Sequence, residues 1–455
     1  MTIDKLPDVA LLEIFDSYLV RTLTPAWYPL VHVCRKWRNV VFGSPRRLGL
    51  QLFCHPRTPV RETLDVWPPL LIVIGASFNE KCDGDNIIAA LEHNDRIYSV
   101  ELWPILSSQS ENVLEAMRRP FPALKRLSLV YEGETLPVLP DSFLGGSTPS
   151  LETLKLQRIP FPGLPKLLLS ATYLVHLHLY DIPHSGYISP DMIVTCLSVL
   201  TRLESFLIIF ESPQSRPDRR RPPPQTRTPL PILSSLHFRG VSEYLEDLVA
   251  RIDVPLLNDL NITFFHQLIF HTPQLNQFIS RTPKFGAHGK AYVNFNDRSV
   301  SMELPPKIFG EPKLELSILC RQSDWQLSSL AQVCSSSFPQ ALIPAVERLY
   351  IYKNTLNYES KDPELVLGWQ DDIESGQWLE LLHPFTAVKD FYIYQDFAPH
   401  IAPALQELVE EGVTEILPAL KTLFLDEAHL SGPAIEHFVA ARQLSGHPIA
   451  VSRWE

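Results

Sequence analysis

The sequence has few cysteines and no long apolar run. Its six cysteines form no Cys-x-x-Cys pair and no histidines stand at zinc-site spacing, so we expect reduced, buried thiols and no metal centre. The longest apolar run, residues 68–76, is shorter than the about 20 residues that a membrane-spanning helix needs. The first residues lack the basic segment and apolar core of a secretory signal. These absences predict a soluble protein of the cytoplasm or nucleus with no membrane partner.

The sequence also lacks the charge of a general nucleic-acid-binding protein and the motifs of common enzymes. Its formal net charge is −11 at pH 7, whereas phosphate backbones favour clustered Lys and Arg, so we expect no nucleic-acid partner. Hydrolase, phosphate-loop and zinc-protease motifs need fixed spacings because their side chains must meet at one atom, and none appears. We therefore predict no catalytic residues and no cofactor. An enzyme with an unrecognised site is kept as an alternative.

What the sequence does contain is a repeated short pattern, apolar-x-x-apolar-x-apolar, beyond residue 90. Successive copies end 23 to 30 residues apart between Leu102 and Ile262, the register then blurs, and the pattern returns later. This spacing is close to the 20–29 residue period of leucine-rich repeats. The copies end at Leu102, Leu129, Leu156, Leu179, Ile208, Phe238, Ile262, Ile351, Ile393 and Leu425.

Helical stretches lie between these strands. In residues 241–252, for example, Tyr244, Leu245 and Leu248 share one helical face. A single strand–turn–helix unit cannot bury both of its apolar faces, so neighbouring units must stack. The prediction is an α/β fold, an irregular leucine-rich-repeat solenoid with a curved parallel sheet and helices on the convex side.

The expected domain organisation follows from these patterns. We assign residues 51–90 to a linker and N-terminal cap, residues 91–430 to the repeats and residues 431–455 to a C-terminal cap. Residues 212–231 are rich in Pro and Arg and predict an exposed, mobile insertion. Its Arg219, Arg220 and Arg221 belong either to a solvated loop or to a signal for nuclear import or an acidic partner.

The N-terminal residues predict short helices with an apolar excess. One helix is expected from about Pro7 to Leu19, and a second helical pattern is ended by residues 43–45. Two or three short helices in fewer than about 50 residues seldom bury enough surface to be stable alone, so a partner or the rest of the chain should cover them. The apolar stripe of the second pattern contains Leu30, Val33, Cys34, Trp37, Val40 and Val41.

These N-terminal residues resemble a known motif. Leu6-Pro7, then Ile14-Phe15, then Val33-Cys34 with Trp37 three residues on, resemble the F-box, and residues 1–50 are assigned to it. Residues 41–48 and 241–248 resemble a large group of basidiomycete fungal F-box proteins. The alternative is an unrelated helical hairpin packed on the repeats. The resemblance implies that the adaptor-binding positions are Leu6, Pro7, Ile14, Phe15, Leu30, Val33, Cys34 and Trp37.

The F-box resemblance also implies a function. Members of that family bind a Skp-type adaptor and, through it, a cullin that carries the ubiquitin-conjugating machinery. The chain would then be the substrate-recognition subunit of an SCF-type ubiquitin ligase, with an unknown target protein bound by the repeats. The alternative is a leucine-rich-repeat scaffold that binds the adaptor without acting in ubiquitination.

The residues between the pattern positions of each strand predict where a target binds. Because side chains alternate faces along a strand, these residues should line the helix-free face of the sheet. In the later strands they are aromatic and should stack into one patch, which either is open or is covered by a C-terminal segment. The predicted target-binding residues are His176, His178, Tyr350, Tyr352, Tyr392, Tyr394 and Phe424.

Overall fold

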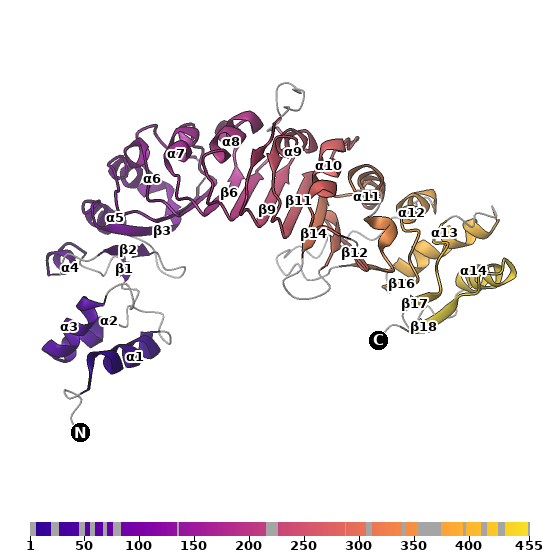
Figure 1. Ribbon diagram of the computed structural model, residues 1–455, viewed down its shortest axis with the longest axis horizontal. Coiled ribbons are helices and arrows are strands. Elements are labelled where there is room, and N and C mark those ends of the chain that lie inside the picture. The colour runs from indigo at the N-terminus through magenta and orange to yellow at the C-terminus, as the bar shows by residue number, and fades with distance from the viewer. Residues whose placement is uncertain are drawn as a thin grey trace. The chain divides into compact units, whose positions relative to one another are not determined.

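The computed structural model describes most of the chain (Figure 1). The described residues are 6–19, 27–44, 51–54, 60–66, 71–75, 83–133, 136–214, 226–286, 288–305, 312–338, 342–353, 375–394, 397–410, 416–425 and 433–453. The chain divides into two compact units: unit 1 is Met1–Ile188 with Thr195–Ser205, and unit 2 is Ser189–Val194 with Phe206–Glu455.

Three short helices begin unit 1: α1 (Asp8–Leu19), α2 (Trp27–Val33) and α3 (Arg35–Gly43). The predicted first helix is confirmed by α1. The predicted second helical pattern is divided into α2 and α3, because the chain becomes extended at Cys34, with φ −159° and ψ 170°. The Cys34 Sγ accepts a hydrogen bond from the Trp37 backbone N–H at 3.5 Å, so the thiol caps the start of α3.

The strands of unit 1 form a parallel sheet with helices on one face (Figure 1). Strands β1 to β6 pair in sequence order, and every pair is parallel. Two of these strands lie within residues 51–90, the expected linker and cap. The strands are β1 (Gln51–Phe53), β2 (Ile72–Gly75), β3 (Ile97–Leu106), β4 (Arg126–Glu132), β5 (Thr153–Gln157) and β6 (His176–Ile182). The helices are α4 (Val60–Val66), α5 (Gly84–Leu91), α6 (Ser107–Ala116) and α7 (Leu164–Ser170).

Unit 2 continues with the same alternation of strand and helix. Helix α8 (Pro190–Leu197) and strand β7 (Ser205–Phe210) contain residues of both units. The further strands are β8 (Thr228–Pro229), β9 (Ser235–Gly240), β10 (Ile252–Asp253), β11 (Asp259–Phe265), β12 (Lys290–Asn296), β13 (Ser299–Leu304), β14 (Lys313–Leu319), β15 (Arg348–Lys353), β16 (Asp390–Ile393), β17 (Thr422–Leu425) and β18 (Ala450–Arg453). The helices are α9 (Ser242–Val249), α10 (Pro273–Arg281), α11 (Ser323–Ser337), α12 (Ser375–Leu382), α13 (Ala398–Glu410) and α14 (Pro433–Leu444).

The sheet of unit 2 contains an insertion that explains the blurred repeat register. The strand order is β9-β11-β14-β13-β12-β15-β16-β17-β18. Strands β14, β13 and β12 pair antiparallel with one another, whereas β11–β14 and β12–β15 are parallel. A three-stranded antiparallel segment therefore occupies the place of one repeat strand, and the pattern regains its period only at β15.

Each predicted repeat strand is confirmed, and its pattern residues form the core between sheet and helices. Leu127, Leu154, Leu177, Leu236 and Leu260, one from each of five strands, are fully buried. Fully burying one such side chain contributes about 1.5–3 kcal/mol relative to exposure, so each repeated leucine stabilises the fold. The fold is thus α/β, with a mostly parallel sheet and helices of the leucine-rich-repeat type in both units.

The Pro/Arg-rich insertion is partly structured. Its end forms β8, which pairs in parallel with β10, and the Leu230 N–H donates to the Asp253 carbonyl at 2.8 Å. Leu230 is 1% exposed, so an apolar anchor fixes this end. The expectation of a mobile loop over all of 212–231 is therefore wrong for its last residues, and Arg219, Arg220 and Arg221 lie outside the described residues.

One negative finding concerns membranes. Across the part of the chain that the structure describes, no helix combines the length and the apolar composition needed to span a bilayer.

Candidate protein-interaction surfaces

Helices α1–α3 have a small core of their own. Phe15 is fully buried, and its ring meets that of Trp37 edge-on, with centroids 4.8 Å apart and an interplanar angle of 61°. Lys36 donates from Nζ to the Leu6 carbonyl at 2.7 Å, which ties the residues before α1 to α3. The other buried apolar residues of the three helices are Leu11, Leu30, Val31, Val40 and Val41.

Several apolar side chains of the same helices remain exposed. Val9 is 65% exposed, Ile14 is 50% exposed and Val33 is 59% exposed. Val33, which belongs to the predicted apolar stripe, ends α2 just before the break at Cys34, and the three helices leave it uncovered. Of the residues predicted to bind an adaptor, Pro7, Ile14 and Val33 are accessible, Phe15 and Leu30 are internal packing residues, and Leu6, Cys34 and Trp37 are half-buried.

A row of stacked aromatic rings crosses the helix-free face of unit 2. Tyr292, Tyr350, Tyr392 and Phe424 occupy matching register positions on β12, β15, β16 and β17, and we call them the aromatic row. Their successive ring centroids are 4.6, 4.2 and 4.2 Å apart, and the interplanar angles are 15°, 10° and 5°. The predicted stacking of Tyr350, Tyr392 and Phe424 is confirmed.

The sequence did not predict Tyr292. It lies in the antiparallel insertion, where the repeat pattern is lost, although the alternation of Ala291, Val293 and Phe295 was a usable strand signal. Tyr352 meets the Tyr292 ring edge-on, with centroids 6.2 Å apart, and Tyr394 is 42% exposed. The structure therefore brings Tyr350, Tyr352 and Tyr392, three of the four predicted tyrosines of unit 2, together with Tyr292.

Next to the aromatic row lies a compensated acidic pair. Glu303 is the register partner of Tyr292, and Glu315 is the partner of Glu303. Lys313 lies 3.4 Å from the Glu303 carboxylate and 3.0 Å from that of Glu315. The side chains of the aromatic row have large rings and few rotatable bonds, and its tyrosines carry a polar hydroxyl. Such side chains suit a protein–protein contact.

The helix-free face of unit 1 has different chemistry. The rings of His176 and His178 lie 6.0 Å apart, and His178 Nε2 is 3.0 Å from the Ser205 Oγ. The Lys155 ammonium lies 5.0 Å from the centroids of both Trp103 and Tyr180. The histidines predicted as target-binding residues therefore belong to a cationic and aromatic surface.

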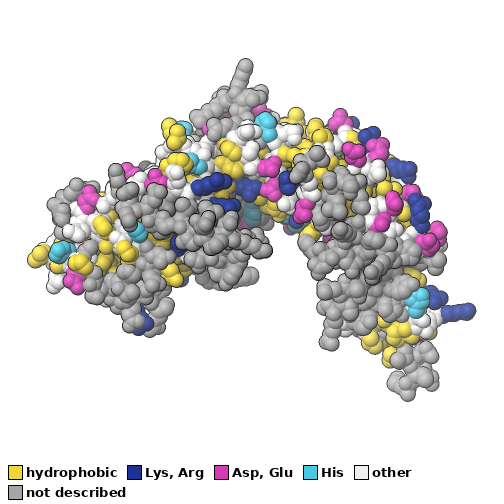
Figure 2. Space-filling view, turned by 180° about the vertical axis from the view of Figure 1, so that it is seen from behind, with side chains coloured by type: hydrophobic (Ala, Val, Ile, Leu, Met, Phe, Trp, Pro, Cys, Tyr) yellow, Lys and Arg dark blue, Asp and Glu magenta, His cyan; other side chains and the backbone are white. Residues whose placement is uncertain are grey.

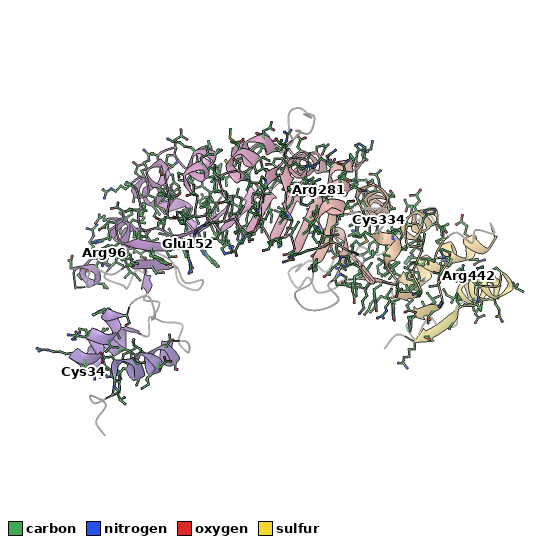
Figure 3. The ribbon with its side chains drawn as sticks, viewed as in Figure 1. Cys34, Arg96, Glu152, Arg281, Cys334 and Arg442 are labelled. Atoms are coloured by element: carbon green, nitrogen blue, oxygen red, sulfur yellow. The ribbon has the colours of Figure 1, made fainter. Side chains whose placement is uncertain are left out.

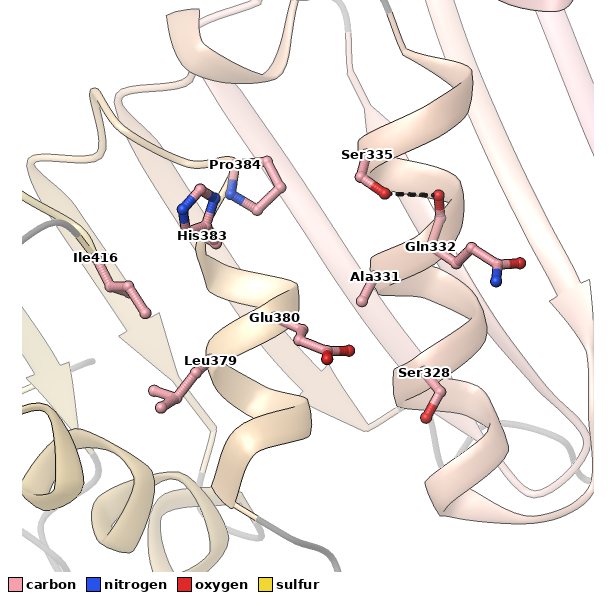
Figure 4. A pocket seen from close by; sticks show the side chains of 9 residues that line it. All are labelled: Ser328, Ala331, Gln332, Ser335, Leu379, Glu380, His383, Pro384 and Ile416. Atoms are coloured by element: carbon pink, nitrogen blue, oxygen red, sulfur yellow. Dashed lines mark hydrogen bonds between the residues drawn. The ribbon is translucent and has the colours of Figure 1, made fainter. Parts of the chain in front are cut away.

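A groove of about 600 Å³ lies between α11 and α12 on the helix side of unit 2 (Figure 4). Ser335 on α11 donates from Oγ to the Gln332 carbonyl at 2.9 Å, and Glu380 and His383 face the groove from α12 and the residue after it. Within the described ranges, no group of three or more His, Cys, Asp and Glu side chains could hold a metal ion. The groove is lined by Ser328, Ala331, Gln332, Ser335, Leu379, Glu380, His383, Pro384 and Ile416.

Most cysteines of the described residues are buried. Cys54, Cys196, Cys320 and Cys334 are buried, as predicted, whereas Cys34 is half-buried and Cys82 lies outside the described residues. Burial raises the pKa of Cys196 to about 11 and that of Cys320 to about 12. Because the thiolate is the nucleophilic form, such thiols are inert packing groups.

Comparison with known proteins gives distant structural likenesses. A scan against protein-family models and a search of curated proteins give no match. The leucine-rich-repeat-containing protein LegL7 from Legionella pneumophila aligns over 87% of this chain and 98% of its own, with 12% identity and a TM-score of 0.27. The complex of Rad7 and Elc1 in yeast contains a chain that aligns over 94% of this one and 91% of its own, with 11% identity and a TM-score of 0.32. Both scores are low, so the surfaces described above rest on the chain's own contacts.

Proposed function

We propose that the chain is the substrate-recognition subunit of a cullin-based, SCF-type ubiquitin ligase of the cytoplasm or nucleus. In this role α1–α3 are an F-box that binds a Skp-type adaptor, and the helix-free faces of the repeats bind a target protein. The F-box resemblance also assigns the chain to the basidiomycete group named above. The observation that carries the proposal is the exposed apolar set of Val9, Ile14 and Val33 on a module that is already packed inside.

The physical argument is the division of labour within the helical module. Phe15 and Trp37 hold the helices together, so Ile14 and Val33 are not needed for the internal core. Three short helices that leave such residues in water gain by covering them with a partner. The chain would then perform no bond chemistry and would act by holding a target lysine close to a conjugating enzyme.

The adaptor contact can be tested with two surface variants. We expect Ile14→Asp with Val33→Asp to reduce co-purification of a Skp-type adaptor by about tenfold or more, because each change places a charge in an apolar contact. The repeats should stay folded, because both side chains are at least half exposed. The measurement is adaptor recovered per full-length chain after co-expression, with circular dichroism of each variant.

One control and one further test variant make the result specific. Leu444→Asp changes an exposed apolar residue outside the helical module, 90% accessible at the end of α14, and should leave adaptor recovery unchanged. Leu6→Ala with Pro7→Ala tests the residues before α1 and should also lower recovery. Unchanged adaptor recovery with the Ile14 and Val33 variants would show that these helices are not the adaptor-binding site.

The scaffold alternative differs at the next step. A substrate receptor should recover a cullin together with the adaptor and support ubiquitination of a bound target. Adaptor binding without cullin recovery would favour the scaffold. The same pull-down, followed by a ubiquitination assay with the reconstituted complex, separates the two.

A further inference from the structure

Charged side chains of both signs are interspersed over the surface that Figure 2 shows. The charge available to a partner must therefore be judged from the residues of each face separately. On unit 1 the helix-free face is built from two register rows of neighbouring strands. One row is Ser99, Arg126, Thr153 and His176. The next row is Glu101, Ser128, Lys155 and His178.

Cations on this face lack ionic partners. Arg126 is exposed and Lys155 is half-buried, and neither forms an ion pair with any residue in the described ranges. The one carboxylate in the two rows is Glu101, which lies two strands from Lys155 and contacts the Ser99 Oγ at 3.5 Å. The part of the face formed by β4, β5 and β6 therefore carries uncompensated positive charge.

The position of Lys155 is fixed by aromatic neighbours. Trp103 and Tyr180 flank its ammonium at equal distances of 5.0 Å, and the Tyr180 ring meets the His178 ring edge-on. Such cation–π contacts hold the charge in place without neutralising it. An anion that approaches the ammonium therefore meets a preorganised charge.

A hydroxyl beside Lys155 also lacks a partner. Ser128 is the register neighbour of Lys155 and is 9% exposed, and its Oγ makes no hydrogen bond to any described residue. Buried polar groups are normally hydrogen-bonded, so an unsatisfied hydroxyl beside the Lys155 ammonium is an available donor for an incoming acceptor.

We propose that the helix-free face of unit 1 over β4–β6 binds an acidic segment of a partner protein, with Lys155 and Arg126 as its anchoring cations. The recognised groups are the carboxylates of Asp and Glu. Arg126 and Lys155 stand on adjacent strands and in adjacent rows, so they fit carboxylates spaced along an extended segment. A nucleic acid fits less well, because Glu101 lies on the same face and few cations face a continuous phosphate backbone.

The inference deepens the proposed role of the repeats in target binding, but it does not depend on the adaptor contact. The probe is a short fluorescent peptide in which Glu alternates with Gly, because alternation places the carboxylates on one side of an extended chain. The full-length protein is titrated at low salt and anisotropy is measured. The matched neutral peptide has Gln in place of Glu.

Lys155→Met with Arg126→Gln removes both charges while keeping side-chain length. We expect this variant to bind the Glu peptide about tenfold more weakly than the native chain. The control is Lys166→Met with Arg119→Gln, which removes two exposed cations of unit 1 that lie outside the two rows and should leave binding unchanged. Lys155→Arg in the native chain keeps the positive charge and should retain most of the affinity.

Three results would overturn the proposal. The first is equal binding of the Glu and Gln peptides, and the second is equal binding by the native chain and the Lys155 and Arg126 variant. The third is binding of a phosphoserine peptide or a single-stranded oligonucleotide to this face when the Glu peptide does not bind. Adaptor recovery by the same variant is expected to be normal, so failure here is distinct from failure of the F-box assignment.

Discussion

Tyr392 illustrates how one side chain of the aromatic row is held by its neighbours. Its ring stacks on Tyr350 and on Phe424, each at a centroid distance of 4.2 Å. Burial raises the pKa of Tyr392 to about 12, and interactions with Tyr350 and the Asp390 carboxylate add to this effect. The folded chain thus favours the neutral phenol.

This pKa gives a prediction with a defined pH window. Since the folded pKa of Tyr392 lies above the ordinary value of 10.0, its contribution to stability is complete below pH 10 and is lost as the pH rises toward about 12. Ultraviolet absorbance titration of the phenolates should therefore show a late step that Tyr392→Phe removes. If the native-minus-variant difference instead titrates near pH 10, the row does not bury this hydroxyl.

Single residues also mark where the sequence was insufficient. The apolar stripe through Val33 and Cys34 also fits one continuous helix, and the break is seen only in the structure, in the extended backbone of Cys34 and the hydrogen bond from the Trp37 N–H to the Cys34 sulfur. Periodicity records which residues are apolar, whereas a cap depends on local geometry. The positions of Tyr350, Tyr392 and Phe424 could be predicted because the regular repeat fixes both face and register.

Among the elements, α10 shows how a repeat helix is docked on its neighbour. The Glu246 carboxylate of α9 accepts from the backbone N–H groups of Gln274 and Leu275, at 2.9 and 2.8 Å, in the first turn of α10. At the other end Arg281, labelled in Figure 3, donates from Nη2 to the carbonyls of Val249 and Ile252. Both ends of α10 are therefore hydrogen-bonded to the preceding repeat, which contains α9 and β10.

Removing Arg281 should loosen this docking. Burial lowers the pKa of Arg281 to about 10. Truncating the Arg281 side chain removes the donor to the carbonyls of two buried residues, Val249 and Ile252. We expect Arg281→Ala to lower the free energy of unfolding by about 2 kcal/mol, measured by urea denaturation. Lys284→Ala removes hydrogen bonds of an exposed lysine to Leu256 and Asn258 and should cost about 0.5 kcal/mol or less. Equal effects of the two variants would contradict this account.

The elements divide clearly into those that the sequence predicts and those that it does not. Strands with the leucine pattern and helices such as α9 and α14 follow from periodicity, because each buries one apolar face. The antiparallel segment β12–β14 alternates apolar and polar residues too, but alternation does not determine which strand pairs with which. Its order, β14-β13-β12, follows from tertiary pairing.

At the scale of the whole molecule, the chain combines surfaces of three chemistries. The helical module exposes aliphatic side chains, unit 1 presents cations, and unit 2 presents stacked aromatic rings. If the first surface binds an adaptor and the other two bind a target, variants of each should fail in separate assays. Loss of adaptor binding and loss of target binding in different variants would be the strongest support for a substrate receptor.

The full-length chain with Ile14→Asp and Val33→Asp can be used to capture targets. It should still bind its target, but without the adaptor the target should not be ubiquitinated and released. Affinity purification and mass spectrometry of this variant would define the set of captured targets. We call the aromatic row together with Tyr352 and Tyr394 the aromatic surface. Adding Tyr352→Ala and Tyr394→Ala should release the captured proteins that contact this surface. Truncating a tyrosine at an interface hot spot often costs about 2 kcal/mol or more, roughly thirtyfold in affinity.

The matched control is Tyr173→Ala, which truncates a tyrosine of unit 1 that is 51% exposed and far along the chain from the aromatic row. It should leave the captured set unchanged, since that ring lies outside the aromatic row and contacts the Arg202 guanidinium, 4.7 Å from its centroid. Circular dichroism must show that the Tyr352 and Tyr394 variant keeps its fold, which is expected because their rings lie at the solvent side of the sheet. If that folded variant retains every captured protein, the aromatic surface does not recognise the target, and recognition must lie on another face of the repeats.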